Sequence, residues 1–308
     1  MSARAWLSLS ITAAVWGASY MFIKVALDGD LSEGFIICVR TLLGAAVLLP
    51  MAVRSGAVPQ IVERRWWALA LAMMQVVVPF GLITFGENHV PTALAGILVA
   101  TAPLFIALIA AKVDPDERAR GWGLFGVLLG MAGVVLLFGV DLSGDAETLV
   151  GGLMVVGAGA CYAVAVLIAK RGFTGVPPVA VAASNLLIGG VLWLPFALAA
   201  LPTHGPGANA VLSMLALSVG GTGIAFLLFY TSIAAVGPAK ASIVSYVAPA
   251  FAVVYGVVLL GEDLTVGTVG GLALILAGSW LAASGRLPSF LSRSGPSRSS
   301  APEPARAR

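Results

Sequence analysis

Three charged side chains lie within otherwise apolar runs of the sequence: Lys24, Arg40 and Glu87. A charge at the centre of a membrane-spanning helix costs about 2.5–3.5 kcal/mol on insertion scales, so such residues indicate a function. A Glu87 carboxylate near Lys24 or Arg40 could form an ion pair that closes an outer gate. The ion pair would break when a substrate or a proton competes for the charge. The alternative is structural: Lys24 and Glu87 reach the membrane interface, and Arg40 binds helix-end carbonyls or a fixed partner.

The sequence offers little for enzymatic chemistry. His89 and His204 are far apart, Cys38 and Cys161 both lie in apolar runs, and no Asp falls within a predicted span. A nucleophile with its base, or a cluster of metal ligands, cannot be assembled from these residues. We therefore expect no enzyme, no metal and no other cofactor. His89 could act as a proton switch, and the alternative is a loop histidine without a role.

The composition indicates an integral membrane protein. Of 308 residues, 59% are hydrophobic and 10% are charged, whereas roughly a quarter of the residues in a soluble domain are charged. Soluble, disordered and nucleic-acid-binding classes are excluded, and the lipid bilayer is the expected surrounding. A spanning helix needs about 20 apolar residues. Ten segments of about that length can be delimited: 6–27, 34–53, 66–86, 92–112, 121–140, 150–170, 177–200, 210–234, 240–260 and 266–284.

The basic residues favour one orientation. With the N-terminus inside, the inner segments hold every Lys and Arg except Lys24 and Arg40, and the outer loops hold none. Because cytoplasmic loops are enriched in Lys and Arg, we expect a multi-pass protein of the cell (inner) membrane with both termini cytoplasmic. The stretch 285–308 is rich in Ser, Pro, Ala and Arg and is expected to be a disordered cytoplasmic tail.

The two halves of the chain resemble each other. Residues 90–105 align with residues 236–251 at an offset of 146, with identities that include a Pro and a Phe near the end. An offset of 145 places Asn185 on Arg40, which makes a second polar residue in the middle of a span. One register across separate helices indicates an internal repeat.

Each repeat, 6–140 and 150–284, contains five predicted spans. Because five is odd, the second repeat must enter the membrane from the opposite side. Inverted repeats are typical of secondary transporters, whose binding site lies near the midplane between the repeats. The expected fold is therefore all-α, with ten transmembrane helices arranged as two inverted five-helix repeats.

The stretches Trp16–Lys24, Arg40–Gly44, Glu87–Gly96 and Pro249–Glu262 occur in an order and spacing that resemble the drug/metabolite transporter superfamily, EamA type. The resemblance covers both repeats, over residues 6–284. It implies a ten-helix bundle with a central cavity. It also implies export of small metabolites such as amino acids, or of toxic compounds.

The resemblance further implies a cavity lined by the first, third and fourth spans of each repeat. Aromatic faces bind apolar or cationic groups there, and Gln, Ser and Tyr side chains orient a ligand. The alternative for each such residue is a place in an interfacial belt or a helix contact. The candidates for substrate binding or gating are Trp16, Tyr20, Gln75, Tyr162, Tyr230, Ser245 and Tyr246, together with Lys24, Arg40, Glu87 and Asn185.

Proline and glycine predict how the spans bend and pack. Pro79, Pro103 and Pro249 fall inside spans, where a missing backbone hydrogen bond is expected to kink the helix. Glycines recur on the fifth and tenth spans, for example Gly126 and Gly278, and small residues allow close helix approach. This contact would join either the two halves of one chain or two protomers of a homodimer.

Together these features favour a secondary carrier that exports small organic metabolites, amino acids or related compounds, by alternating access. The substrate would be a small molecule. No nucleotide-binding Walker A motif occurs in the sequence, so a gradient is the expected energy source. The alternatives are a multidrug or toxic-compound efflux carrier and, beyond these, a non-transporting membrane scaffold.

Overall fold

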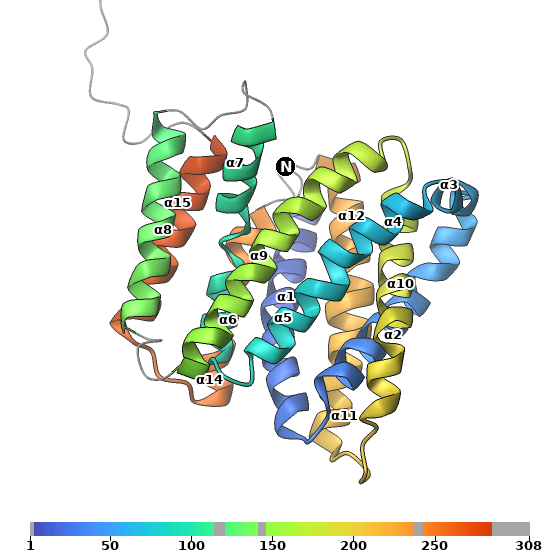
Figure 1. Cartoon of the computed structure of the whole chain (residues 1–308), viewed down its shortest axis with the longest axis horizontal. Helices are drawn as coiled ribbons and strands as arrows, with labels where there is room; N and C mark the ends of the chain where they lie inside the picture. The colour runs from blue at the N-terminus through green and yellow to red at the C-terminus, as the bar shows by residue number, and fades with distance from the viewer. Residues whose placement is uncertain (1–2, 114–120, 141–145, 237–242, 285–308) are drawn as a thin grey trace, which may run out of the picture.

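The computed structural model of the chain describes four stretches, residues 3–113, 121–140, 146–236 and 243–284. Every regular element in these stretches is a helix (Figure 1). They contain eight helices long and apolar enough to cross a membrane and two shorter apolar helices, Val244–Leu260 and Val266–Ala282. The prediction of an all-α membrane protein is therefore confirmed. The predicted tail, 285–308, lies outside the described residues.

The helices follow the predicted segments closely, because a chain in lipid must satisfy its backbone hydrogen bonds within the helix. The first half forms α1 (Ala3–Asp28), α2 (Glu33–Arg54), α3 (Val58–Glu63), α4 (Arg65–Ala72), η1 (Met73–Val77), α5 (Val78–Gly86), α6 (Thr92–Val99), α7 (Ala102–Val113) and α8 (Trp122–Val140). The second half forms α9 (Ala146–Gly172), α10 (Pro178–Ala199), α11 (Ala208–Leu215), η3 (Ala216–Ile224), α12 (Ala225–Val236), α14 (Ile243–Leu260) and α15 (Val266–Ser284).

Two spans contain a π-helical segment. The segment η1 joins α4 to α5, and η3 joins α11 to α12. Such turns are rare and are frequent at functional sites. Pro79 follows η1 in the first turn of α5, and Pro103 follows the break between α6 and α7. Two of the three expected proline kinks thus coincide with interruptions, whereas α14 continues through Pro249.

The packing of the helices builds one bundle. At its two edges α2 packs along α10 and α8 packs along α15 (Figure 1). Between these pairs, α1 packs on α11, α12 and α14, while α9 packs on α5, α6 and α7, and α6 packs on α14. Each half of the chain therefore contributes helices to every layer, and the interior is formed by contacts between the halves.

Glycines explain the close contact of α8 with α15. A Cβ on Gly126 would lie 2.7 Å from the Gly278 carbonyl oxygen, so the two backbones meet without side chains between them. Of the two predicted contacts for these glycines, the one between the halves of a single chain is present. Contact with a second protomer stays a prediction.

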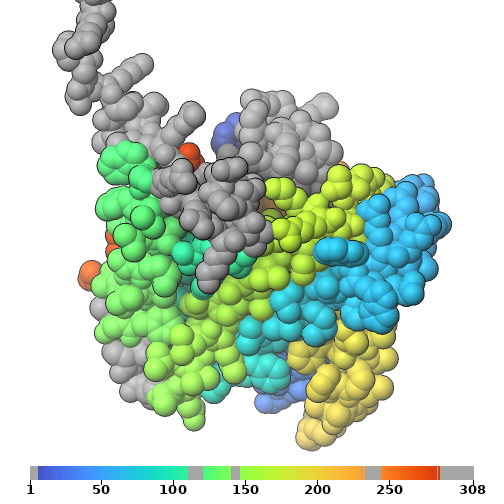
Figure 2. Space-filling view, turned by 45° about the horizontal axis from the view of Figure 1, so that its top comes forward, coloured from blue at the N-terminus to red at the C-terminus, as the bar shows by residue number. Residues whose placement is uncertain are grey.

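The outer surface of the bundle is apolar. Figure 2 shows one face, on which α8 (green), α9 (yellow-green) and the α3 to α5 segment (blue to cyan) lie side by side. Leu128 on α8, Leu153 on α9 and Trp66 on α4 are all more than half exposed. Contiguous exposed apolar surface on this scale marks a membrane-facing protein.

Candidate substrate site

Arg40 on α2 lies in the interior of the bundle and is 7% exposed. Its Nε donates a hydrogen bond to the Thr222 hydroxyl of η3 at 3.0 Å, and its guanidinium carbon lies 4.0 Å from the centre of the Phe80 ring on α5. The hydrogen bond and the cation–π contact together fix the guanidinium plane. Within the described part of the chain its two terminal nitrogens have no hydrogen-bond partner. They can therefore bind an oxyanion such as a carboxylate.

The local sequence explains how η3 comes so close to Arg40. Gly44 lies one turn later on α2, and a Cβ there would stand 2.6 Å from the methyl carbon of Thr222, so a larger residue would push η3 away. The Thr222 hydroxyl donates to the Leu217 carbonyl, five residues earlier, at 2.9 Å. Both residues lie in the π-helical segment η3. Thr222 donates one bond and accepts one from Arg40, which fixes its orientation.

A second polar contact has the same arrangement with the halves exchanged. Asn185 on α10 is 2% exposed, and its Nδ2 donates to the Gln75 Oε1 of η1 at 3.3 Å. Arg40 on α2 thus contacts η3, and Asn185, at the aligned position of the repeat, contacts η1. The Asn185 Oδ1 is buried and has no hydrogen-bond partner in the described residues. Three predicted site residues therefore lie where α2 and α10 meet the π-helical segments.

Two tyrosines complete the surroundings of Arg40. Tyr20 on α1 and Tyr162 on α9 both interact electrostatically with Arg40. Both also pack against the same buried apolar cluster, which includes Ile23 and Leu217. A phenol hydroxyl can donate and accept hydrogen bonds. The structure thus brings together a cation and two hydroxyl groups from three helices.

Glu87 directly follows the last residue of α5 and lies just beyond the end of that span. Its side chain is fully buried, and neither carboxylate oxygen has a hydrogen-bond partner among the described residues. Burial raises the pKa of the Glu87 carboxyl well above its usual range; Arg40 opposes this rise, Glu262 adds to it and Lys24 opposes it. Burial therefore stabilises the neutral, protonated form of Glu87 relative to a carboxyl group in water.

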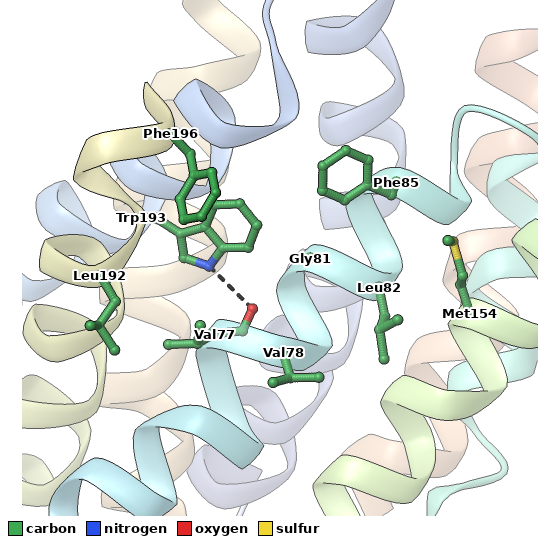
Figure 3. A pocket seen from close by; sticks show the side chains of 9 residues that line it. All are labelled: Val77, Val78, Gly81, Leu82, Phe85, Met154, Leu192, Trp193 and Phe196. Atoms are coloured by element: carbon green, nitrogen blue, oxygen red, sulfur yellow. Dashed lines mark hydrogen bonds between the residues drawn. The ribbon is translucent and has the colours of Figure 1, made fainter. Parts of the chain in front are cut away.

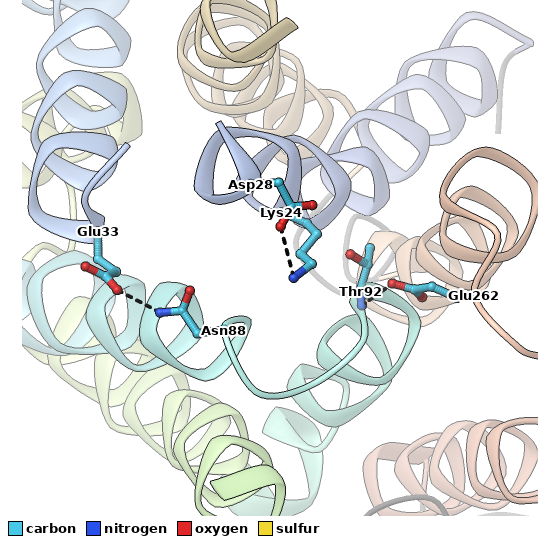
Figure 4. A network of polar contacts seen from close by, with 6 residues as sticks. All are labelled: Lys24, Asp28, Glu33, Asn88, Thr92 and Glu262. Atoms are coloured by element: carbon cyan, nitrogen blue, oxygen red, sulfur yellow. Dashed lines mark hydrogen bonds and ion pairs between the residues drawn. The ribbon is translucent and has the colours of Figure 1, made fainter. Parts of the chain in front are cut away.

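Polar contacts join several helix ends where α1 ends and α6 begins (Figure 4). The Asn88 amide donates to the Glu33 carboxylate at 2.7 Å, which connects the α5–α6 loop to the start of α2. The Glu262 carboxylate accepts the backbone N–H groups of Thr92 and Ala93 at 2.6 and 2.8 Å. We call this side of the bundle the latch end, defined by Glu33, Asn88, Thr92 and Glu262.

The ion pair expected between Glu87 and a basic residue is absent from the described residues. Lys24 instead pairs with Asp28, one turn later on α1, at 3.2 Å, and both side chains are partly exposed. His89 lies 3.7 Å from the carboxylate of Glu147 at the start of α9. Exposed pairs of this kind contribute at most about 1 kcal/mol. Lys24 therefore follows the structural alternative, in which it reaches the end of the bundle.

Three other predicted residues, Trp16, Tyr246 and Ser245, do not join the Arg40 cluster in the described structure. Trp16 packs against two phenylalanines of α12, with ring centres 4.9 and 5.7 Å away. The Tyr246 hydroxyl donates to a backbone carbonyl of α15 at 3.5 Å. Ser245 is exposed, and the side chain of Tyr230 lies outside the described residues. For Trp16 and Tyr246, the contacts seen are those of helix packing.

A cavity of about 300 Å³ lies between α5, α9 and α10 (Figure 3). Its lining is apolar, and the Trp193 indole N–H donates to the Val77 carbonyl at 3.1 Å rather than into the cavity. Phe85 and Phe196 in the lining are 40% and 61% exposed, so the cavity opens at the surface of the bundle. Because it offers no polar group to orient a ligand, the polar cluster around Arg40 is the better candidate for a substrate site.

Sequence reasoning missed the partners that the predicted residues have in the structure. Phe80 and Thr222 hold Arg40, yet each is unremarkable within an apolar run. One signal was present for Thr222, because its spacing from Gln75 (222 − 75 = 147) is close to the repeat offsets of 145 and 146. The backbone bonds accepted by Glu262 had no signal in the sequence, because they depend on how the chain folds back.

Comparison with known proteins shows which family the chain resembles. The model of the EamA-like transporter family matches residues 4–139 and 149–284. The uncharacterized transporter YoaV of Bacillus subtilis (strain 168) is 24% identical over 271 residues, covering 87% of this chain and 92% of that protein. The uncharacterized inner membrane transporter YedA of Escherichia coli (strain K12) is 27% identical over 254 residues, covering 82% and 81%. A crystal structure with 23% identity superposes with a TM-score of 0.66 over 92% of this chain and 97% of its own, which shows a shared fold.

Proposed function

Because the chain belongs to the EamA-like transporter family, we propose that it is a secondary carrier that exports small organic metabolites, amino acids or related compounds, by alternating access. The observation that supports amino acids and related compounds as substrates is the buried guanidinium of Arg40. Its Nε is held by Thr222 and its face by Phe80, which leaves the terminal nitrogens for a ligand. A guanidinium fork binds carboxylates with defined geometry. Arg40 therefore anchors the carboxylate of the substrate.

Alternating access requires two related halves, and several features support an arrangement as ten helices in two inverted repeats. The family model matches the chain twice, once in each half. The π-helical segments η1 and η3 occur in the third span of each half. The contact of Arg40 with η3 has its counterpart in the contact of Asn185 with η1. Rocking of one half against the other would open this interior site to either side.

The distribution of basic residues supports an orientation for the bundle. The latch end carries Asp28, Glu33 and Glu262, and the opposite end carries Arg54 and Arg64. By the positive-inside rule, the latch end faces outward and both termini lie in the cytoplasm. The protein is then a multi-pass protein of the cell (inner) membrane. In the conformation described here, hydrogen bonds join helix ends at the latch end, and at the opposite end Arg64 donates to the Gly172 carbonyl.

Efflux of cationic drugs is the second candidate class, and the site argues against it. A buried Arg40 would repel a quaternary ammonium group, and its nearest aromatic face, that of Phe80, is already occupied by the guanidinium. Like charges placed together in a site of low polarity are unfavourable. A carboxylate-bearing metabolite is therefore the preferred substrate.

Counterflow in proteoliposomes tests this proposal. Purified protein would be assayed for uptake of labelled amino acids, nucleosides and quaternary ammonium drugs, with Arg40→Ala as the comparison. We expect saturable, competable uptake of amino acids that Arg40→Ala abolishes. Efflux from preloaded cells tests the direction of transport. Uptake restricted to cationic drugs would overturn the proposed substrate class, and folded protein with no uptake of any compound would favour a scaffold.

A further inference from the structure

The helix α6 has no cap of its own. Pro91 at its N-cap makes no side-chain hydrogen bond, and the first N–H groups of a helix have no partner within that helix. The Glu262 carboxylate, from the other half of the chain, accepts the N–H groups of Thr92 and Ala93 instead. A negative charge at this position is also stabilised by the helix dipole. We call these two hydrogen bonds the Glu262 latch.

The turn after α14 is built to present this carboxylate. Gly261 has a φ of +70°, which reverses the chain, and the Glu262 N–H then donates to the Gly256 carbonyl at 3.0 Å. This is the pattern of a glycine-terminated helix end. A Cβ on Gly256 would occupy the place of the Glu262 carboxylate. Two glycines therefore allow Glu262 to fold back and reach α6.

Glu87 lies in the loop that leads to the latched end of α6. The loop of residues 87–91 connects α5 to α6, and the Glu87 carboxylate is fully buried there without a hydrogen-bond partner in the described residues. The buried hydroxyls of Thr84 and Thr92 also lack partners in that part of the chain. A charge on Glu87 would be costly in such surroundings, because a buried carboxylate needs a counter-charge or several donors.

The charges around Glu87 supply this compensation only in part, although Arg40 and Lys24 both act in favour of a charged Glu87. Glu262 acts unfavourably on a charged Glu87, Lys24 is paired with Asp28, and the Nε of Arg40 is bonded to Thr222. The titratable and charged groups on the elements packed around this loop include Tyr20, Lys24 and Asp28 on α1, Glu33 and Arg40 on α2, Glu147 and Tyr162 on α9, Tyr246 and Tyr255 on α14, Glu262 after α14, and His89 in the loop itself. Closure of the latch and a charge on Glu87 thus oppose each other.

We propose that Glu87 is a proton-binding site that couples closure of the latch end to H⁺. The latch closes with the proton on Glu87, and the end opens when that proton leaves to water and the carboxylate becomes hydrated. The inference deepens the proposed function by naming H⁺ as the coupling ion of the carrier. The latch itself can be measured without any substrate.

Hydrogen–deuterium exchange of the Thr92 and Ala93 amides in nanodiscs tests the proposal, since their protection depends on Glu262. The exchange rates, corrected for the intrinsic rate, report the opening equilibrium of the latch. In the wild type we expect this equilibrium constant to increase about tenfold per pH unit above the pKa of Glu87, because opening releases one proton. In Glu87→Gln, opening should not change with pH. The control Glu63→Gln alters an exposed glutamate of α3 and should behave as the wild type. Equal slopes in Glu87→Gln and the wild type would overturn the proposal.

A transport measurement separates this inference from the proposed function. In proteoliposomes, an imposed pH gradient should change the rate of amino-acid uptake by the wild type and by Glu63→Gln, but not by Glu87→Gln. Uptake by the wild type that ignores the gradient would refute the proton site and leave the carrier in place. If no amino acid is transported, the proposed function fails, while the exchange experiment still decides whether Glu87 controls the latch.

Discussion

Among the residues that the structure describes, the Thr222 hydroxyl is the group that accepts a hydrogen bond from the Arg40 guanidinium. Thr222→Val keeps the shape of the side chain and removes this acceptor, so a buried cation loses one hydrogen bond. A hydrogen bond to a charged group contributes about 1.5–3 kcal/mol, or roughly 10- to 100-fold in affinity. We therefore expect Thr222→Val to raise the KM of counterflow by that order. Thr222→Ser keeps the hydroxyl and should stay near the wild-type value; equal effects of the two variants would contradict this role.

The buried Glu87 carboxyl also predicts a pH-dependent stability. Its pKa is raised in the folded protein, whereas in the unfolded chain it is about 4.3. Between these two values the unfolded state releases a proton that the native state keeps, so stability falls as pH rises, by up to about 1.4 kcal/mol per pH unit. Glu87→Gln removes this dependence. Its melting temperature should match the wild type near pH 4 and exceed it increasingly at higher pH; a constant difference would speak against the burial of an ionisable Glu87.

The sequence indicates candidate site residues better than it indicates which side chains they contact. A charge in an apolar run identified Arg40, and the repeat offset added Asn185, which lies at the corresponding contact. The ion pair considered for Glu87 is absent from the described structure, because the sequence does not tell which side chain of a helix end will be nearest. Lys24 has Asp28 one turn away, and that local pair formed instead.

At the scale of elements, the close approach of α2 to η3 depends on Gly44. Gly44→Ala places a methyl group against Thr222, which should separate the two helices and weaken transport in the same direction as Thr222→Val. Overpacking of this kind costs about 1–3 kcal/mol, measurable as a lower melting temperature. Gly220→Ala on η3 is the matched control, since nothing lies within 4 Å of its added Cβ. Loss of transport in both variants would indicate a general effect on η3 rather than this contact.

The spans themselves could be predicted from apolar length, because only a continuous helix satisfies its backbone in lipid. Their interruptions could be predicted only in part. Pro79 and Pro103 coincide with breaks, whereas Pro249 lies within a continuous α14. The π-helical segment η3 contains no proline, and its Thr222 makes a tertiary contact with Arg40. Sequence pattern carries no signal for a turn of that kind.

At the scale of the whole molecule, the orientation of the bundle predicts which loops are accessible from outside. Gly205 lies in the exposed loop between α10 and α11 at the latch end, and Gln60 is exposed on α3 at the other end. In intact cells, a membrane-impermeant maleimide should label Gly205→Cys, but label Gln60→Cys only after permeabilisation. The unsubstituted chain, with Cys38 buried and Cys161 partly buried, controls for background labelling. The reverse pattern would invert the topology and place the latch in the cytoplasm.

The central claim is that Arg40 binds the carboxylate of a small metabolite inside a bundle built from both halves of the chain. The most direct measurement is counterflow of a transported amino acid in competition with its unlabelled free acid, its amide and its decarboxylated amine. We expect the free acid to compete, and the amide and the amine to fail, because neither offers an anionic oxygen pair to the guanidinium. Competition by the amide as strong as by the acid would contradict the claim.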